Sequence, residues 1–159
     1  MSTRVNHFKA TPALVKSLSE LSMATGNASV APTLKHLIDI RVSQLNGCAF
    51  CLDMHVKEAK IDGERELRIY HLPIWRESPL FSAREKAALA FAEALTRITE
   101  HGVSDALYRN LTEHFSETEI AELNFMIAVI NTWNRLQITA RAVPGSMDAA
   151  FGLTKADLA

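Results

Sequence analysis

The sequence has no excess of basic residues, no long apolar run and little glycine or proline, and each shortage excludes a class of protein. Seventeen Lys and Arg residues stand against eighteen Asp and Glu residues, a formal net charge of −1 at pH 7. Because a nucleic-acid-binding surface needs basic residues to neutralise phosphates, we expect no nucleic-acid partner. The apolar run from Phe125 to Ile130 is far too short to span a bilayer, so we expect no membrane partner. Residues 1–7 lack the apolar segment of a secretory signal, which predicts a cytoplasmic location.

The shortage of helix-breaking residues predicts an all-α protein. Six glycines and five prolines in 159 residues are too few for the frequent turns of an all-β chain. Apolar residues recur at steps of three and four, and two Ser/Glu pairs, at 82/85 and 116/119, have the spacing of capping boxes. We predict helices over residues 12–26, 32–46, 48–61, 64–72, 82–99, 104–114 and 116–141. They form a single domain over 1–159, with a core over about 11–141 and a C-terminal tail over 142–159.

The two cysteines are free for chemistry, because a chain of 159 residues with 48% apolar content can bury a sufficient core without a covalent brace. They are Cys48 and Cys51, and two randomly placed cysteines in this chain would show that spacing roughly one time in eighty. Residues three apart share one helix face, at a separation that a disulfide can bridge. Gly47 before the pair predicts that both lie in the first helical turn, where the helix dipole favours a thiolate. In a reducing compartment such a pair is typical of a redox-active dithiol.

His55 extends this pattern by one helical turn beyond Cys51. At that spacing an imidazole can accept the thiol proton or hold a thiolate as an ion pair. A zinc site is disfavoured because Cys48, Cys51 and His55 supply only three ligands, and Asp53 could complete the four only if the helix distorted. The sequence has no glycine-rich phosphate loop, so we expect no nucleotide cofactor.

The cysteine pair lies in a distinctive segment, RVSQLNGCAFCLDMH at residues 41–55. This segment, together with residues 75–79, 82–94 and 114–135, closely resembles the single-domain branch of the AhpD-like alkylhydroperoxidases, in the carboxymuconolactone decarboxylase superfamily. The resemblance implies an all-α, AhpD-like helical bundle that assembles into trimers or hexamers. It further implies that the cysteine pair reduces organic hydroperoxides without a bound cofactor and is regenerated by a dithiol donor, such as a lipoyl or thioredoxin-like protein.

The resemblance also assigns a role to four positions. Cys51 matches the thiol that attacks the peroxide, and Cys48 matches the more exposed resolving thiol that meets the reductant. His55 matches the proton-relay histidine. His36 stands where the family usually has a proton-accepting glutamate, and histidine can accept a proton near neutral pH. We therefore expect Cys51, Cys48, His55 and His36 to form the catalytic set.

Other side chains are candidates for supporting roles. The phenol of Tyr70 or the carboxylate of Glu77 can replace the family glutamate that His36 substitutes. Asp39 and Ser43 are expected on a helix surface. Three polar residues on the otherwise apolar last helix are expected to link helices through hydrogen bonds: Asn131, Asn134 and Arg135. The apolar residues expected to wall a substrate pocket are Phe50, Leu52 and Met54, with Trp75 or Trp133.

Three other functions remain open from the sequence. The same pair can exchange disulfides with a protein or a small thiol without reducing peroxide. The superfamily also contains decarboxylases, lactonases and isomerases of ring-derived acids, whose chemistry needs no cysteine couple. Finally, a binding or assembly subunit can carry the two cysteines as vestiges, in which case they react with no oxidant at neutral pH.

Overall fold

The computed structural model describes residues 4–156, and every regular element within them is a helix. The predicted all-α fold is therefore confirmed. The longer helices are α2 (Pro12–Gly26), α3 (Pro32–Asn46), α4 (Ala49–Ile61), α6 (Ala83–Thr96), α7 (Asp105–Thr112) and α8 (Glu117–Ala140). The short ones are α1 (His7–Ala10), α5 (Glu66–His71) and α9 (Asp148–Phe151), with 3₁₀ turns η1 (Leu72–Ile74) and η2 (Leu153–Lys155). Residues 1–3, part of the segment from which the location was predicted, lie outside the described residues.

The helix boundaries follow the local signals in the sequence. Ser82 and Ser116 both form the predicted capping boxes, in which each serine side chain accepts a hydrogen bond from the backbone N–H three residues later. α3 ends at Gly47, whose φ of 69° is left-handed and suits glycine. α6 ends at Thr96 rather than Thr99. No helix within residues 4–156 is both long and apolar enough to cross a bilayer.

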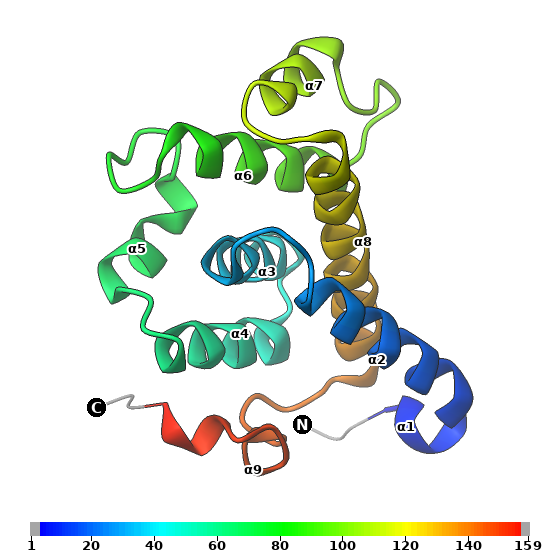
Figure 1. The fold of residues 1–159 in the computed structure, drawn as a ribbon. Helices are drawn as coiled ribbons and strands as arrows, with labels where there is room; N and C mark the ends of the chain where they lie inside the picture. Colours follow the sequence, from blue (N-terminus) through cyan, green and yellow to red (C-terminus); the bar gives the residue numbers. More distant parts are fainter. Residues whose placement is uncertain (1–3, 157–159) are drawn as a thin grey trace.

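α3 lies at the centre of the molecule, and α4, α6 and α8 pack around it (Figure 1). Its apolar side chains at positions 37, 38, 40 and 42 are completely buried. Asp39 and Ser43 are buried as well, with 2% and 0% of their surface exposed, so the prediction that they lie on a helix surface is wrong. Periodicity indicates which face of a helix is apolar, whereas α3 has helices on several sides, and these also bury the side chains of Asp39 and Ser43.

Glu93 of α6 ties this central helix to the segment after α5. Its Oε1 accepts hydrogen bonds from Arg41 Nε of α3, at 2.7 Å, and from Trp75 Nε1, at 2.9 Å. Arg76 pairs with the other oxygen at 2.6 Å. Burial raises the pKa of Glu93, but the hydrogen bonds from Trp75, Arg76 and Arg41 outweigh burial and hold this pKa below its ordinary value of 4.5.

We expect Glu93→Gln to lower the free energy of unfolding by about 1–3 kcal/mol at pH 7, because the hydrogen bonds lose their charged acceptor. A carboxylate with a lowered native pKa stabilises the fold above its unfolded pKa, and this contribution disappears as the pH falls through the native pKa. The difference between wild type and variant should therefore shrink below about pH 4.5. Urea unfolding between pH 3 and pH 7 measures this difference. Glu100→Gln is the control, since the Glu100 side chain is 86% exposed, and an equal loss in both variants would contradict the assignment.

Residues 142–156 turn back after α8 and lie against α4, at the bottom of the view in Figure 1. Arg141 makes the turn with a left-handed φ of 53°. Leu153 of η2, which packs on α4, is only 4% exposed. The weakly patterned tail therefore packs against the helix that carries the cysteines.

Candidate active site

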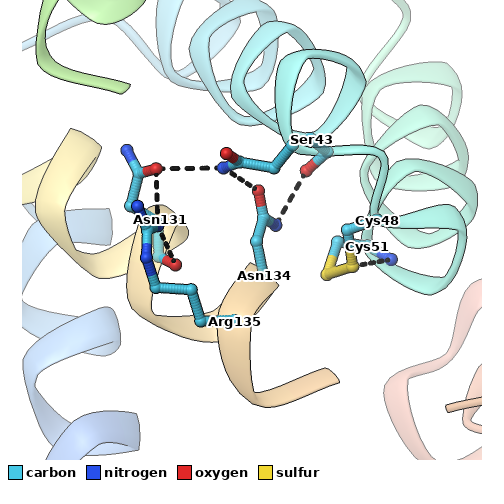
Figure 2. Close-up of a disulfide and its surroundings, with 7 residues drawn as sticks. Ser43, Cys48, Cys51, Asn131, Asn134 and Arg135 are labelled. Atoms are coloured by element: carbon cyan, nitrogen blue, oxygen red, sulfur yellow. Dashed lines mark hydrogen bonds between the residues drawn. A yellow bond between two sulfur atoms is a disulfide. The ribbon is translucent and has the colours of Figure 1, made fainter. Parts of the chain in front are cut away.

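Cys48 and Cys51 form a disulfide at the start of α4, with their Cα atoms 5.4 Å apart (Figure 2). Cys48 is the N-cap of the helix, and its Sγ accepts a hydrogen bond from the backbone N–H of Cys51 at 3.3 Å. The left-handed Gly47 ends α3 directly before it, so the chain reverses and starts α4 within one residue. The prediction that the pair lies in the first turn and can close into a disulfide is confirmed.

Both sulfur-bearing residues are buried in the folded chain: Cys48 is 2% exposed and Cys51 is 1% exposed. The prediction that Cys48 is the more exposed thiol stays a prediction, because within one chain both residues are almost completely covered. The reason is the C-terminal tail, because Ala142 and Met147 pack against the cluster formed by Cys48, Phe50 and Cys51. Sequence spacing could not reveal this cover, which comes from residues far along the chain.

Cys51 opens on a cavity of about 410 Å³, whereas Cys48 is not among the residues that line it. The walls come from α1, α2, α3, α4, α8 and the tail, and most of the lining surface is apolar. The apolar lining residues are Phe8, Met23, Phe50, Met54, Met126, Val129, Ile130, Trp133, Met147 and Phe151. Of the predicted pocket walls, Phe50, Met54 and Trp133 are confirmed, whereas Leu52 and Trp75 pack into the main core instead. A cavity of this size and character is typical of a site for a small organic molecule.

His55 lines the cavity together with Cys51, and the charged lining residues lie around it, at what we call the polar end of the cavity. His55 Nδ1 lies 2.7 Å from Glu58 Oε2 and 3.9 Å from Asp39 Oδ2. Lys35 pairs with Asp39 one turn earlier on α3. Burial of Lys35 lowers its pKa, but the charge of Asp39 and the hydrogen bond between them raise this pKa above its ordinary value, so Lys35 stays protonated. The imidazole thus lines the same cavity as Cys51, with two carboxylates on its Nδ1 side.

Asp39, Glu58 and Lys35 were missed in the sequence as members of the site. A signal for two of them was present, because Lys35 and Asp39 stand four apart and face each other on one helix. Glu58 likewise stands three residues after His55, within reach on the same helix. What the sequence did not show is that α3 and α4 pack so that these two local pairs meet.

His36 does not join this group. Its Nε2 lies 2.7 Å from Asp62 Oδ2, at the far end of α4, and the residue is not among those that line the cavity. Tyr70 and Glu77 are not among them either; Tyr70 is exposed and donates its hydroxyl proton to Glu66 at 3.1 Å. Of the four predicted site residues, the structure brings together Cys48, Cys51 and His55 and leaves His36 apart. Among residues 4–156, no cluster of three or more His, Cys, Asp or Glu side chains is arranged to hold a metal ion.

A network of amides holds the turn that precedes the cysteines. Asn46 Nδ2, at the end of α3, donates to Asn131 Oδ1 at 2.9 Å and to Asn134 Oδ1 at 2.8 Å. Asn134 Nδ2 in turn donates to Ser43 Oγ at 3.2 Å, and Arg135 donates to Asn131 (Figure 2). The predicted network that links helices is confirmed. It fastens the end of α3 to α8 directly before Gly47 and so fixes where α4 begins.

The family profile described as the carboxymuconolactone decarboxylase family matches residues 12–94, a span that contains α2, α3 and α4 and therefore the cysteine pair. The chain belongs to this family. An uncharacterized relative from Bacillus subtilis strain 168, YdfG, is 43% identical over 138 residues, which cover 87% of this chain and 94% of the relative. A crystal structure of a protein of unknown function from Agrobacterium tumefaciens, provisionally described as the antioxidant defence protein AhpD, is 40% identical with a TM-score of 0.86. It matches 90% of this chain and 98% of its own.

More distant solved structures share the fold at lower identity. An uncharacterized peroxidase-related protein from Ralstonia eutropha, described as an AhpD core, has a TM-score of 0.77 at 19% identity, over 87% of this chain and 74% of its own. The debrominase Bmp8, solved with 2,3,4-tribromopyrrole, has a TM-score of 0.78 at 20% identity, over 90% of this chain and 76% of its own. The predicted AhpD-like architecture is therefore confirmed.

Proposed function

We propose that the protein is a thiol-dependent peroxidase that reduces organic hydroperoxides through a cycle of the Cys48 and Cys51 thiols and their disulfide. One observation supports this proposal above the others: the sulfur of a pair that closes into a disulfide faces an apolar cavity beside a histidine. The apolar walls suit the organic part of a hydroperoxide, and the polar end around His55 suits its O–O group.

In the reduced protein, the Cys51 thiolate attacks the terminal oxygen of the hydroperoxide. The O–O bond breaks, the alcohol leaves with a proton, and Cys51 becomes a sulfenic acid. The Cys48 thiol then attacks the Cys51 sulfur, the S–O bond breaks, and water leaves as the disulfide forms. The two electrons come from the thiol pair, and an external dithiol, such as a lipoyl or thioredoxin-like protein, restores them by disulfide exchange.

In this scheme His55 first takes the thiol proton of Cys51 and later delivers a proton to the leaving alkoxide. The Nδ1 side of the ring faces Glu58 and Asp39, so Nε2 is the nitrogen that serves the cavity. The carboxylates stabilise the imidazolium that forms when His55 accepts the proton, and Lys35 balances the charge of Asp39. His36 has no step in this scheme because it lies outside the cavity.

A second candidate is disulfide exchange without peroxide chemistry. The observation in its favour is the position of Cys48 at the N-cap of α4, where the Cys51 N–H and the helix dipole also stabilise a Cys48 thiolate. Burial of the two sulfurs does not separate the functions, because both need a dithiol or disulfide partner to reach the pair. The apolar cavity at Cys51 favours the peroxidase, since disulfide exchange makes no use of it. A role in decarboxylation has no feature of this site in its favour, because such chemistry makes no use of a cysteine pair.

The deciding experiment treats the reduced protein with one equivalent of cumene hydroperoxide and measures peroxide loss together with the mass of the intact protein. Consumption of the peroxide, with loss of two hydrogens from the protein, is the result expected of the peroxidase. Oxidation by glutathione disulfide, with no consumption of cumene hydroperoxide, would instead support the disulfide exchanger. Thiols that react with neither oxidant would exclude both functions. Assembly into trimers or hexamers and a cytoplasmic location remain predictions.

A further inference from the structure

The tail builds one wall of the cavity and is held there by a buried ion-pair cluster. Met147 and Phe151 are the tail residues that line the cavity. Lys57 Nζ, on the outer face of α4, donates to Asp53 Oδ2 and to Asp148 Oδ2, each at 2.7 Å. The backbone N–H of Gly145 donates to the same Asp53 oxygen at 2.9 Å. Gly145 precedes Met147 and Asp148 follows it, so the tail is fastened to α4 on both sides of Met147.

Lys57, at the centre of this ion-pair cluster, is buried and protonated. Lys57 is only 6% exposed, and its hydrogen bonds with Asp148 and then Asp53 raise its pKa above the ordinary value. Lys57 therefore keeps its charge at neutral pH. Because both carboxylates and the Gly145 N–H converge on one side of α4, the tail is held in a defined register. This register carries Met147 to the cysteines, where it contacts the cluster of Cys48, Phe50 and Cys51.

The tail and the other walls of the cavity share one side-chain type, methionine. All four methionines within the described residues line it, one each from α2, α4, α8 and the tail: Met23, Met54, Met126 and Met147. Thioether side chains are unbranched and polarizable, so they adapt to apolar ligands of different shapes. Phe151 adds an aromatic ring to a cavity that Trp133 of α8 also lines. Without the tail, the cavity would lose two apolar residues and open to solvent.

We propose that Met147 and Phe151 are specificity-determining residues, which bind the apolar body of the hydroperoxide and distinguish bulky organic hydroperoxides from hydrogen peroxide. The proposal rests on the proposed function, since it concerns the substrate of the same site. Hydrogen peroxide has no apolar body to contact this wall, so the wall does not stabilise the transition state for its reduction. Asp148 and Lys57 act as positioning residues that hold the wall in place.

The test compares Met147→Ala, Phe151→Ala and Asp148→Asn with wild type. The measured quantity is kcat/KM for cumene hydroperoxide divided by kcat/KM for hydrogen peroxide. We expect this ratio to fall about tenfold in each truncation, mainly through a higher KM for cumene hydroperoxide, and less in Asp148→Asn. Met147→Leu, which conserves volume, should recover most of the ratio. Val143→Ala is the matched control, because Val143 is a tail residue that is 46% exposed and does not line the cavity.

A binding measurement keeps the test independent of turnover. Methyl-¹³C-methionine spectra of the oxidised protein are titrated with 2-phenyl-2-propanol, the alcohol formed from cumene hydroperoxide. We expect shifts of the methionine methyl signals in wild type and a dissociation constant about tenfold higher in Met147→Ala and Phe151→Ala. Unchanged affinity and an unchanged ratio in folded variants would overturn the proposal, as would an alcohol that shifts no methionine signal in wild type. If the alcohol binds at this wall but no peroxide is consumed, the proposed peroxidase function fails, whereas the assignment of Met147 and Phe151 as ligand-binding residues stands.

Discussion

Cys51→Ser should reduce the rate of organic hydroperoxide consumption by more than about a thousandfold, the largest effect on activity that we expect in this protein. Cys51 supplies the sulfur that faces the cavity, and a serine hydroxyl stays protonated at neutral pH and is a far weaker nucleophile. The neighbouring Cys48 does not line the cavity, so it cannot take over the attack without a change in structure. Initial rates with cumene hydroperoxide and excess dithiol measure the loss.

Cys48→Ser is the matched control, because it removes the other sulfur of the same disulfide. In this variant Cys51 should still react once with the peroxide and then stop as a sulfenic acid, since no thiol remains to displace water. Trapping with dimedone, followed by peptide mass analysis, locates the modified sulfur. A sulfenic acid trapped on Cys48 of the Cys51→Ser protein, with none on Cys51 of the Cys48→Ser protein, would reverse the two roles.

Asn134→Ala should cause the largest loss of stability among the polar residues around the site. Asn134 is completely buried, accepts from Asn46 Nδ2 at 2.8 Å and donates to Ser43 Oγ at 3.2 Å. Its removal leaves the buried Ser43 hydroxyl and the half-buried Asn46 amide with fewer partners and also leaves a small cavity. Each buried group that loses its partner costs about 1–3 kcal/mol, so we expect the free energy of unfolding to fall by about 2–4 kcal/mol.

This loss corresponds to a decrease in Tm of about 4–16 °C for a domain of this size. Calorimetry and urea unfolding measure it, and Thr139→Ala is the control because Thr139 is an exposed residue on the same helix. The variant should also loosen the turn before Gly47, so its disulfide should be reduced faster by dithiothreitol than that of wild type. A stability within about 0.5 kcal/mol of wild type would show that the amide network contributes little.

The sequence allowed prediction of features that depend on near neighbours. The capping boxes at Ser82 and Ser116, the glycine that ends α3, and the position of the cysteine pair in the first turn of α4 are all encoded within a few residues. His55 could be assigned to the same site for that reason, since it lies one turn beyond Cys51 on one helix. Composition and periodicity predicted an all-helical chain, and the family resemblance supplied its AhpD-like arrangement, which the fold and the comparisons confirm.

The errors concern contacts between segments that are far apart in the sequence. Asp39 was placed on a surface because helical periodicity shows only which face is apolar, and the packing of other helices around α3 buries this carboxylate as well. The burial of Cys48 could not be foreseen either, because part of its cover comes from Ala142 and Met147, far along the chain. His36 fitted the family position, but its partner is Asp62 rather than a residue of the cavity.

The sequence by itself determined the helices, the redox-competent spacing of Cys48 and Cys51, and the imidazole one turn away, because helix geometry relates residues three and four apart without help from the rest of the chain. Only the tertiary structure decided which sulfur faces a cavity, which carboxylates stand behind His55, and that the tail closes the site. Those outcomes depend on how α3, α4, α8 and the tail pack together, and packing is a property of the whole core rather than of any short segment.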